Sequence, residues 1–264
     1  MAILTTDSQN YEDIADAIRA KTGSQATMKP GQMATAIASI PSGGGVDLGN
    51  GREISNSDAF QYPGQNFTFS LPSTVLDIGF YALNNALQYC SSVTKVDLSS
   101  LTSVTGNYGL YMMCRGCANL TSLDLSSLTT ISGNNALDSA FYNCNKLASV
   151  DLSSLASVTA SSAFSSAFYN CTALPSMSFG SLTSVTGAFA FNNAFSYCTS
   201  LASLSFPALT ADSFGSFVTQ FNNMLYGVTG CTVHFPAAIQ STIGSWSSVT
   251  GGFGGTNTTV SFDL

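Results

Sequence analysis

The stretch CNKLASVDLSSLASVTASSAFSSAFYN, residues 144–170, decides the fold, because the stretch directly before it, CANLTSLDLSSLTTISGNNALDSAFYN at 117–143, follows the same pattern. Self-similarity at a fixed period of this length is typical of proteins built from stacked structural repeats. The clearest markers of the period are five evenly spaced cysteines: Cys90, Cys117, Cys144, Cys171 and Cys198. The sequence therefore predicts a stack of similar units.

Each unit divides into two parts with different spacing of apolar residues. In the unit that begins at Cys117, Leu120, Leu123 and Leu125 form an L-x-x-L-x-L pattern that alternates as a strand does, and a turn containing Gly or Ser follows. After the turn, apolar residues fall at i, i+3, i+4 and i+7, the spacing of one helix face. These residues are Leu137, Ala140, Phe141 and Cys144. A unit of this size cannot bury its own apolar stripe, so we expect an α/β solenoid of strand-turn-helix units with a parallel sheet.

The sequence predicts four parts of the chain: the repeats and three segments that flank them. Residues 1–41 have helical spacing in two short runs, and we expect a helical hairpin too small to bury its own core. A glycine-rich linker follows at 42–57, the solenoid spans 58–236, and a C-terminal cap at 237–264 ends in a strand near 258–263. In the last unit the pattern is shifted by two residues, which puts Gly227 in the place of the repeated cysteine. The apolar residues expected to attach the hairpin to a partner are Tyr11, Ile14, Ile18, Met33, Ile37 and Ile40.

The pair Cys114 and Cys117 has the C-x-x-C spacing of a redox dithiol or half of a zinc site. Cys117, however, belongs to the repeated column, and Cys114 stands where the next unit has Phe141. We therefore expect both side chains in the core, where a free cysteine behaves as a small hydrophobe.

The composition excludes several classes of function. A formal net charge of −7 would repel nucleic acid and acidic membrane surfaces. The chain has no apolar run of about 18 residues, so no membrane span is predicted. The N-terminus lacks the pattern of a secretory signal, which indicates synthesis in a reducing cytoplasm. The lone histidine, His234, has no evident catalytic partners, and no nucleophile or phosphate-binding motif occurs, so we predict no enzyme, no cofactor and no metal site.

Two repeated rows remain as candidate binding surfaces. Asp97, Asp124 and Asp151 occupy one outward strand position, where a cation such as Ca²⁺ could bind or where each carboxylate could accept N–H bonds from the serines that follow it. The second row consists of aromatic side chains near the end of each unit, which could either bind a ligand or pack between the units. Its members are Tyr89, Tyr142, Tyr169, Tyr197 and Tyr226.

Two resemblances add to these patterns. LPSTVLDIG at 71–79 and AFYNC at 140–144 resemble the BspA-like branch of the leucine-rich repeat family, over roughly residues 60–236. YEDIADAIRAKTG with MKPGQMATAI near the N-terminus, and CTVHFPAAIQ with FGGTNTTVSFDL near the C-terminus, resemble parts of tail and baseplate-associated proteins in phages and prophages of gut bacteria.

These resemblances imply a non-enzymatic virion protein, assembled in the host cytoplasm. The hairpin would attach to other tail proteins or to copies of itself, and the solenoid would bind a host cell-surface glycan or protein. The alternative is a bacterial surface adhesin of the BspA-like type.

Overall fold

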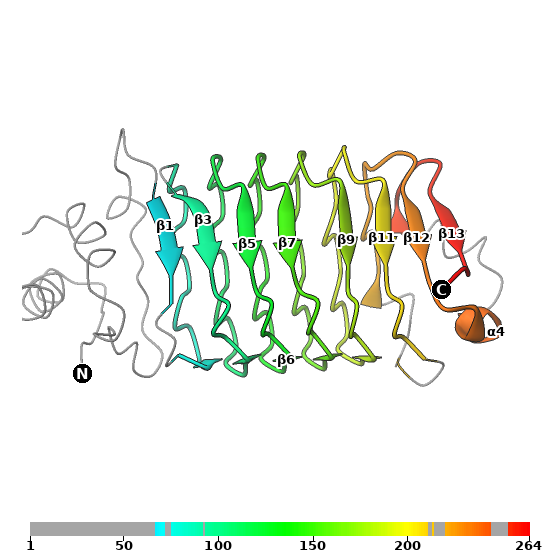
Figure 1. Ribbon diagram of the computed structural model, residues 1–264, viewed down its shortest axis with the longest axis horizontal. Helices are drawn as coiled ribbons and strands as arrows, with labels where there is room; N and C mark the ends of the chain where they lie inside the picture. Colours follow the sequence, from blue (N-terminus) through cyan, green and yellow to red (C-terminus); the bar gives the residue numbers. More distant parts are fainter. Residues whose placement is uncertain (1–66, 72–74, 92, 211–212, 214–219, 244–252) are drawn as a thin grey trace, which may run out of the picture.

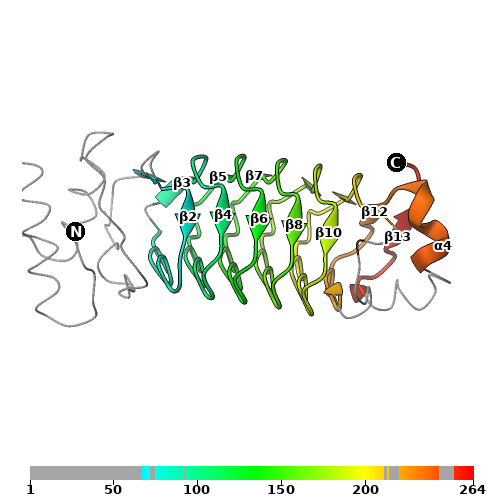
Figure 2. The ribbon, with the colours of Figure 1, turned by 90° about the horizontal axis from the view of Figure 1, so that it is seen from below.

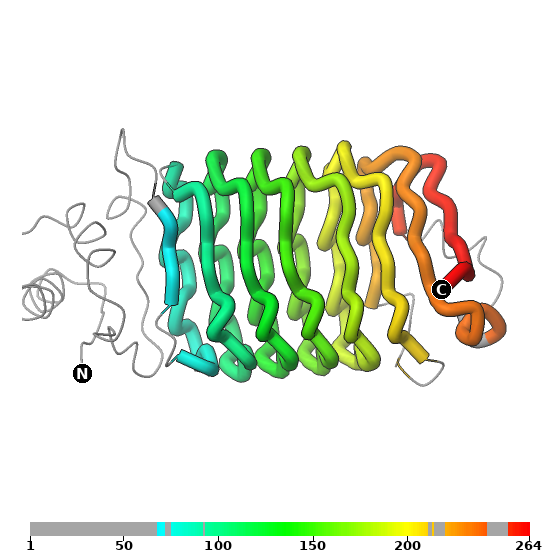
Figure 3. The backbone as a smooth tube through the Cα atoms, in the orientation of Figure 1, coloured from blue at the N-terminus to red at the C-terminus, as the bar shows by residue number. Residues whose placement is uncertain are grey.

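The computed structural model describes residues 67–71, 75–91, 93–210, 213, 220–243 and 253–264. This part of the chain winds into an elongated solenoid whose coils follow one another along a single axis (Figures 1 and 3). The predicted hairpin at 1–41 and the linker at 42–57 lie outside the described residues.

Short parallel strands form two walls of the solenoid. The front wall, labelled in Figure 1, contains two sheets in the orders β1-β3-β5-β7 and β9-β11-β12-β13; the back wall, turned toward the viewer in Figure 2, has the order β2-β4-β6-β8-β10. The front-wall strands are β1 (Phe67–Ser70), β3 (Val93–Asp97), β5 (Ser122–Asp124), β7 (Ser149–Asp151), β9 (Ser176–Ser178), β11 (Ser203–Ser205), β12 (Thr232–His234) and β13 (Thr259–Ser261). The back-wall strands are β2 (Asp77–Ile78), β4 (Ser103–Val104), β6 (Thr130–Ile131), β8 (Ser157–Val158) and β10 (Ser184–Val185).

The strand register confirms the predicted repeat and the parallel sheet. Leu123 pairs with Val150 on the front wall, and Thr130 pairs with Ser157 on the back wall, so each residue pairs with its equivalent in the next repeat. Within a strand, the central apolar residue points inward while its neighbours face out, as in the buried Leu123 of β5 between the partly exposed Ser122 and Asp124.

The front wall divides into two sheets beside Pro175. In the coil before it, the N–H of Ala148 donates to the carbonyl of Thr121 at 2.9 Å. Pro175 occupies the same repeat position and has no N–H to continue this series. Its own carbonyl still accepts the N–H of Ala202 at 2.9 Å, so the bonding resumes in the next coil.

The prediction of a short helix in each repeat is wrong. The segment between the back wall and the next front-wall strand is a chain of overlapping turns, in which every fourth residue has a positive φ. In one coil these residues are Asn135 (φ 54°), Ser139 (55°) and Asn143 (62°). N–H groups donate alternately to the carbonyl three residues earlier and to the next coil: Ala140 bonds Leu137 at 3.1 Å, and Ser139 bonds Ser165 at 2.8 Å. We call this the turn face.

Stacking distance explains why turns replace the helix. Neighbouring strands lie about 4.8 Å apart, whereas a helix with its side chains is about 10–12 Å wide. Because strands on both walls hold successive coils at the strand spacing, a helix in every coil has no room. Turns that bond to the next coil keep the same spacing on all sides, and the residue at positive φ is often Asn or Gly, which tolerate that conformation best.

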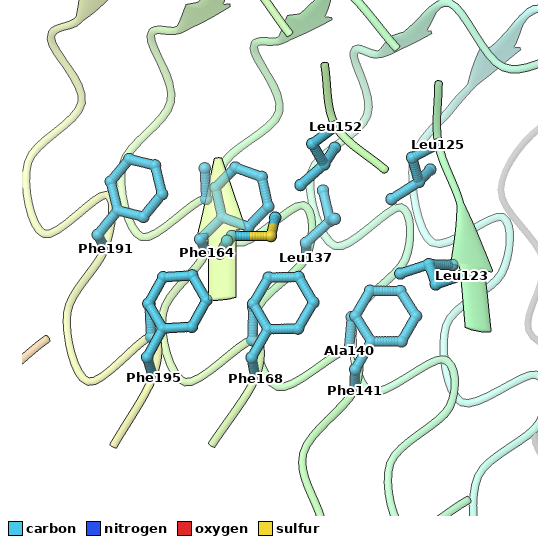
Figure 4. Packing of buried hydrophobic residues seen from close by; sticks show 14 of the residues in the cluster. Leu123, Leu125, Leu137, Ala140, Phe141, Leu152, Phe164, Phe168, Phe191 and Phe195 are labelled. Atoms are coloured by element: carbon cyan, nitrogen blue, oxygen red, sulfur yellow. The ribbon is translucent and has the colours of Figure 1, made fainter. Parts of the chain in front are cut away.

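Columns of like residues fill the core. Phe164 stacks on Phe191 with ring centroids 5.1 Å apart, and Phe141, Phe168 and Phe195 form a second stack at 5.5 and 5.3 Å (Figure 4). In earlier coils the first column holds Leu83, Leu110 and Leu137, and the second holds Leu87 and Cys114. The turn face thus buries the stripe that the sequence assigned to a helix, although its backbone is different.

The repeated cysteines lie in the core, as predicted, and they do more than fill space. The thiol of Cys144 donates to the carbonyl of Cys114 at 3.2 Å, and the thiol of Cys171 donates to that of Phe141 at 3.2 Å. Each thiol thereby links two coils. Cys114 and Cys117 are both buried, and burial raises the pKa of Cys114 well above its ordinary value, so the C-x-x-C pair is part of this packing.

The C-terminal part keeps the period better than the sequence suggested. Relative to the regular repeat, the last coil is shifted by two residues in its strand, where Val233 pairs with Leu204, and by three residues on the turn face. The N–H of Val228 bonds the carbonyl of Leu225 as the N–H of Cys198 bonds that of Phe195, so Val228 and not Gly227 takes the cysteine position. After a short helical turn at η2 (Ala237–Ile239) and α4 (Gln240–Ile243), β13 pairs with β12 in the register of the regular repeat. The predicted terminal strand therefore continues the front wall.

Candidate binding surface

The aspartate row lies on the front wall, and each carboxylate is occupied locally. Asp124 accepts the N–H of Ser126 at 3.0 Å, and Asp151 accepts that of Ser153 at 3.0 Å. Asp97 accepts both the N–H (3.1 Å) and the hydroxyl (2.7 Å) of Ser99, and these bonds lower its pKa. Within the described residues, no group of three or more His, Cys, Asp or Glu side chains could hold a metal ion. Each carboxylate of the row therefore has the local hydrogen bond to a serine that the sequence offered as the alternative to a bound cation.

His234 continues the row of Asp and Ser side chains on the front wall, where it pairs in register with Ser205 and Ser261. Its Nδ1 lies 2.9 and 3.1 Å from the two carboxylate oxygens of Asp263, and the hydrogen bond with His234 lowers the pKa of Asp263. The sequence did not identify this partner, although Asp263 follows His234 by little more than one repeat. Among the described residues, no serine hydroxyl bonds the imidazole, so the arrangement orients the ring without activating a nucleophile.

Most of the predicted tyrosines come together on the turn face. Tyr142 and Tyr169 stack with centroids 4.4 Å apart and planes within 3°. Tyr197 lies 5.2 Å from Tyr169, and Tyr226 lies 5.5 Å from Tyr197 in an edge arrangement. We call Tyr142, Tyr169, Tyr197 and Tyr226 the tyrosine row. It runs along the solenoid axis over four coils.

The row offers neutral hydroxyls beside exposed ring surface. Desolvation, with smaller contributions from Tyr142 and Tyr197, raises the pKa of Tyr169 to about 12, so this hydroxyl keeps its proton at neutral pH. Tyr197 and Tyr226 leave 37% and 50% of their surfaces exposed. Tyrosines combine large contact area with a hydroxyl that can donate or accept, which suits both sugars and proteins.

Two tyrosines reach their places through positive φ angles and a glycine in the next coil. Tyr89 (φ 58°) and Tyr197 (φ 59°) occupy the same repeat position. A Cβ on Gly227 would lie 2.7 Å from the Tyr197 ring, and a Cβ on Gly116 would collide with the Tyr89 ring. Glycine at each site therefore leaves room for the ring above it. Tyr89 is separate from the tyrosine row and lies one coil before Arg115.

Arg115 extends the tyrosine row at its N-terminal end, and the sequence did not single it out. Its guanidinium carbon lies 4.7 Å from the centroid of the Tyr142 ring, within the range of a cation–π contact. Arg115 stands one repeat before Tyr142 at the equivalent position, so the repeat period alone indicates that Arg115 belongs to this column. It was missed because the row was sought among aromatic residues only.

The back wall presents a regular hydroxyl surface that the sequence did not single out either. Its strands place Ser103, Thr130 and Ser157 outward in register, one residue per coil. The signal is the S-V-T or T-I-S triplet that recurs in successive repeats. Several threonines beside this wall bond the coil before them; Thr129, for example, donates through Oγ1 to the carbonyl of Thr102 at 3.0 Å. This surface is flat, small and polar.

These features define the class of protein: a solenoid of leucine-rich repeats, in which two walls of short strands and a turn face surround a columnar core. The family model described as the BspA type leucine rich repeat region, in six copies, matches residues 52–191 and 108–229. The chain belongs to this BspA-type leucine-rich repeat family. Solenoids of this family are generally non-enzymatic binding scaffolds, and leucine-rich-repeat proteins typically bind other proteins.

Two solved structures are similar to the chain. A leucine-rich repeat protein of T. pallidum, TpLRR, is 20% identical over 75% of this chain and 89% of its own, with a TM-score of 0.38. A leucine-rich repeat protein from Bacteroides ovatus is 17% identical over 69% of this chain and 58% of its own, with a TM-score of 0.27. No curated protein matches the chain significantly in sequence.

None of the helices within the described residues is long and apolar enough to cross a membrane.

Proposed function

We propose that the chain is a non-enzymatic attachment protein whose turn face binds a glycan or protein on the surface of a host cell. The observation that carries the proposal is the tyrosine row, which lines up phenol rings from four successive coils. A partner that extends along the axis can contact all of them at once. Since the coils are joined by hydrogen bonds on both walls and on the turn face, the row is rigid, and little entropy is lost when it binds.

The rest of the surface supports recognition over catalysis. The back wall displays Ser and Thr hydroxyls in register, and the carboxylates of the front-wall row are bonded to neighbouring serines. With His234 bonded to Asp263 on an exposed sheet surface, the groups best suited to acid–base chemistry serve a structural pairing. A repeated, neutral, hydroxyl-rich surface fits contacts that are individually weak and gain strength through many copies.

We place these copies on the particle of a phage, as a tail, baseplate or fibre protein. The support is the resemblance of the N-terminal segment to tail-associated proteins. The residues proposed to attach it, Tyr11, Ile14, Ile18, Met33, Ile37 and Ile40, would dock on another tail protein or on copies of the same segment. The solenoid would then project toward the host.

Antibody labelling of purified particles tests this placement. Electron microscopy should show label at one end of the particle, while a preparation from a strain that lacks the gene should show none. Particles that carry no label, although the antibody detects the purified chain, would contradict a virion role.

A bacterial surface adhesin is the second candidate, and membership of the BspA-type family favours it, because members of that family are often surface-associated. The same antibody on intact cells separates the two candidates. Label on the cell surface and not on particles would identify the adhesin.

A further inference from the structure

Arg115 differs from the other cationic side chains of the described residues in having no oxygen partner. Lys95 lies 3.9 Å from a carboxylate oxygen of Asp97, and Lys146 donates to the amide oxygen of Asn119 at 2.8 Å. Arg115, by contrast, donates through Nη1 only to the sulfur of Met112 at 3.5 Å, and its Nε is buried without a hydrogen-bond partner. A guanidinium has five N–H donors, so most of its hydrogen-bonding capacity is unused here.

The carboxylate of Asp138 interacts with the charge of Arg115 but forms no ion pair with it. Asp138 accepts the side-chain amide of Asn135 at 3.0 Å and the hydroxyl of Ser139 at 2.8 Å. Burial raises the pKa of Asp138 more than the two hydrogen bonds and the charge of Arg115 lower it. Within the described residues, no nitrogen of Arg115 lies within 4.0 Å of a carboxylate oxygen.

A second polar side chain beside Arg115 has the same poor partner. The amide nitrogen of Gln88 contacts the sulfur of Met112 at 3.8 Å, and no other side-chain hydrogen bond joins Gln88 to a described residue. A thioether is a weak acceptor, so it does not satisfy either group. Two donors from adjacent coils therefore converge on one sulfur atom.

Tyr89 adds an exposed ring in the coil before Arg115, to whose carbonyl its N–H donates at 2.6 Å. Its ring lies over the backbone of Gly116, directly after Arg115 in the chain, and 47% of its surface is exposed. The guanidinium itself lies over the Tyr142 ring, the first of the tyrosine row. An aromatic surface beside unsatisfied donors is a combination that recognises a ring with a charged substituent.

We propose that Arg115, Gln88 and Tyr89 form a subsite for the carboxylate-bearing sugar of an acidic saccharide chain whose remaining units lie along the tyrosine row. This subsite rests on the proposed attachment function and names its ligand class. The guanidinium would donate a bidentate pair of bonds to the carboxylate, Gln88 would add an amide donor, and the Tyr89 ring would contact the sugar.

Charge selects a carboxylate over a more highly charged anion. The chain carries a formal net charge of −7, so a polyphosphate or nucleic acid meets long-range repulsion. The cation of Arg115 lies beside a neutral ring and an amide, with the Asp138 carboxylate outside ion-pair distance, which suits a ligand with one negative charge per recognised unit. Sugars that carry a single carboxylate meet both conditions.

Calorimetric titration of the full-length chain at pH 7 and low salt tests the subsite with a tetrasaccharide of three glucose units and one terminal glucuronic acid, and with the methyl ester of that acid, in which a neutral ester replaces the carboxylate. We expect the acid to bind about tenfold tighter than the ester, the size of a charge-assisted hydrogen bond. R115Q should remove this preference and leave binding of the ester unchanged. R115K should restore it only in part, because lysine cannot form the bidentate pair.

K146Q is the matched control, since it removes the same charge from a side chain bonded to Asn119. It should keep the preference for the acid. A preference that survives R115Q, or one that K146Q abolishes equally, would overturn the subsite. So would binding of free acetate as tight as that of the tetramer, because no saccharide would then be needed.

The outcome is separable from that of the attachment function. If the chain shows no preference for the acid while tyrosine variants still lose host attachment, the subsite fails and the attachment function stands. If the tyrosine variants attach normally, the attachment function fails whatever the calorimetry shows.

Discussion

The coils before and after Pro175 share one backbone but differ both inside and outside. In the core, Leu98, Leu125 and Leu152 form a column that continues as Phe179, Phe206 and Phe235. On the front wall, the aspartate row ends at Asp151, and Ser178 takes the next position. Core and surface thus change together where the front wall divides into two sheets.

This difference distinguishes the backbone features that define each coil from the side chains that fill its core. The turn face keeps a positive φ at every fourth residue on both sides of Pro175, as at Asn143 before it and Asn193 after it. The thiol-to-carbonyl bonds also persist, from Cys117 to Cys198. Because the same core column holds Leu before Pro175 and Phe after it, the hydrogen bonds between coils, more than the shape of the core residues, set the stacking distance.

The largest effect should come from the aromatic columns. Phe191 stacks between Phe164 and Phe221 at 5.1 and 5.2 Å and meets Phe179 edge-on. We expect F191A to lower the free energy of unfolding by about 4 kcal/mol, and L110A, in the same column, by about 3 kcal/mol, because ring pairs add to the burial lost. Urea unfolding followed by circular dichroism measures both. A greater loss for L110A would show that the aromatic half is not the better packed.

The next-largest loss of stability should be equal in the coils before and after Pro175. Gly116 (φ 75°) and Gly227 (φ 74°) lie on opposite sides of Pro175, each beneath a tyrosine ring. G116A and G227A should each cost about 1–2 kcal/mol, because alanine is strained at positive φ. G180A is the control, since its Cβ would meet only the carbonyl of Ser153 at 3.6 Å. Thermal unfolding of the three variants should separate the first two from the third.

The cysteine column should also give equal effects. C117A and C198A, on opposite sides of Pro175, each remove a buried thiol that donates to the preceding coil, and we expect each to cost about 1 kcal/mol. With burial raising the pKa of Cys171 well above its ordinary value, native protein should react with a thiol reagent at pH 8 only as it unfolds. Rapid labelling of native protein would contradict the assigned role.

The smallest effect on stability should be confined to the coils before Pro175, which carry the aspartate row. Hydrogen bonds from Ser99 lower the pKa of Asp97, so its stabilisation is present above the unfolded-state pKa and is lost as the pH falls through the folded-state pKa. D97S should therefore be less stable than the native chain at pH 7 by less than about 1 kcal/mol, with the difference shrinking as the pH falls below the ordinary pKa of an aspartate. Melting temperatures across this pH range test the sign, and a difference that grows with acidity would contradict it.

The sequence predicted the period, the parallel strands and the buried cysteines because these depend on side chains that recur in every repeat. It failed on the turn face, since the spacing of Leu137, Ala140 and Phe141 buries one stripe in a helix and in a chain of turns alike. The signal that separates a helix from a chain of turns is the series Asn135, Ser139 and Asn143. These residues follow one another at intervals of four, and all three have a positive φ.

The binding surface was predicted in part for a similar reason. Tyr142 and Tyr169 share one repeat column and stack, whereas Tyr89 and Tyr197 belong to the neighbouring column at positive φ. Only the backbone conformation brings Tyr197 between Tyr169 and Tyr226. Asp263, similarly, reaches His234 through a strand pairing that the sequence of the tail did not reveal.

Attachment of the purified full-length chain to host cells tests the central claim, that the turn face carries the binding function. The double variant Y142A/Y169A removes the stacked pair of the row, and T130A/S157A, on the back wall, is the control for a double substitution at the surface. With both variants shown to be folded by circular dichroism, flow cytometry of labelled protein should show at least a tenfold weaker attachment for Y142A/Y169A, on the order of 1–3 kcal/mol for aromatic contacts at an interface, and native attachment for the control. Native attachment by Y142A/Y169A would contradict the account.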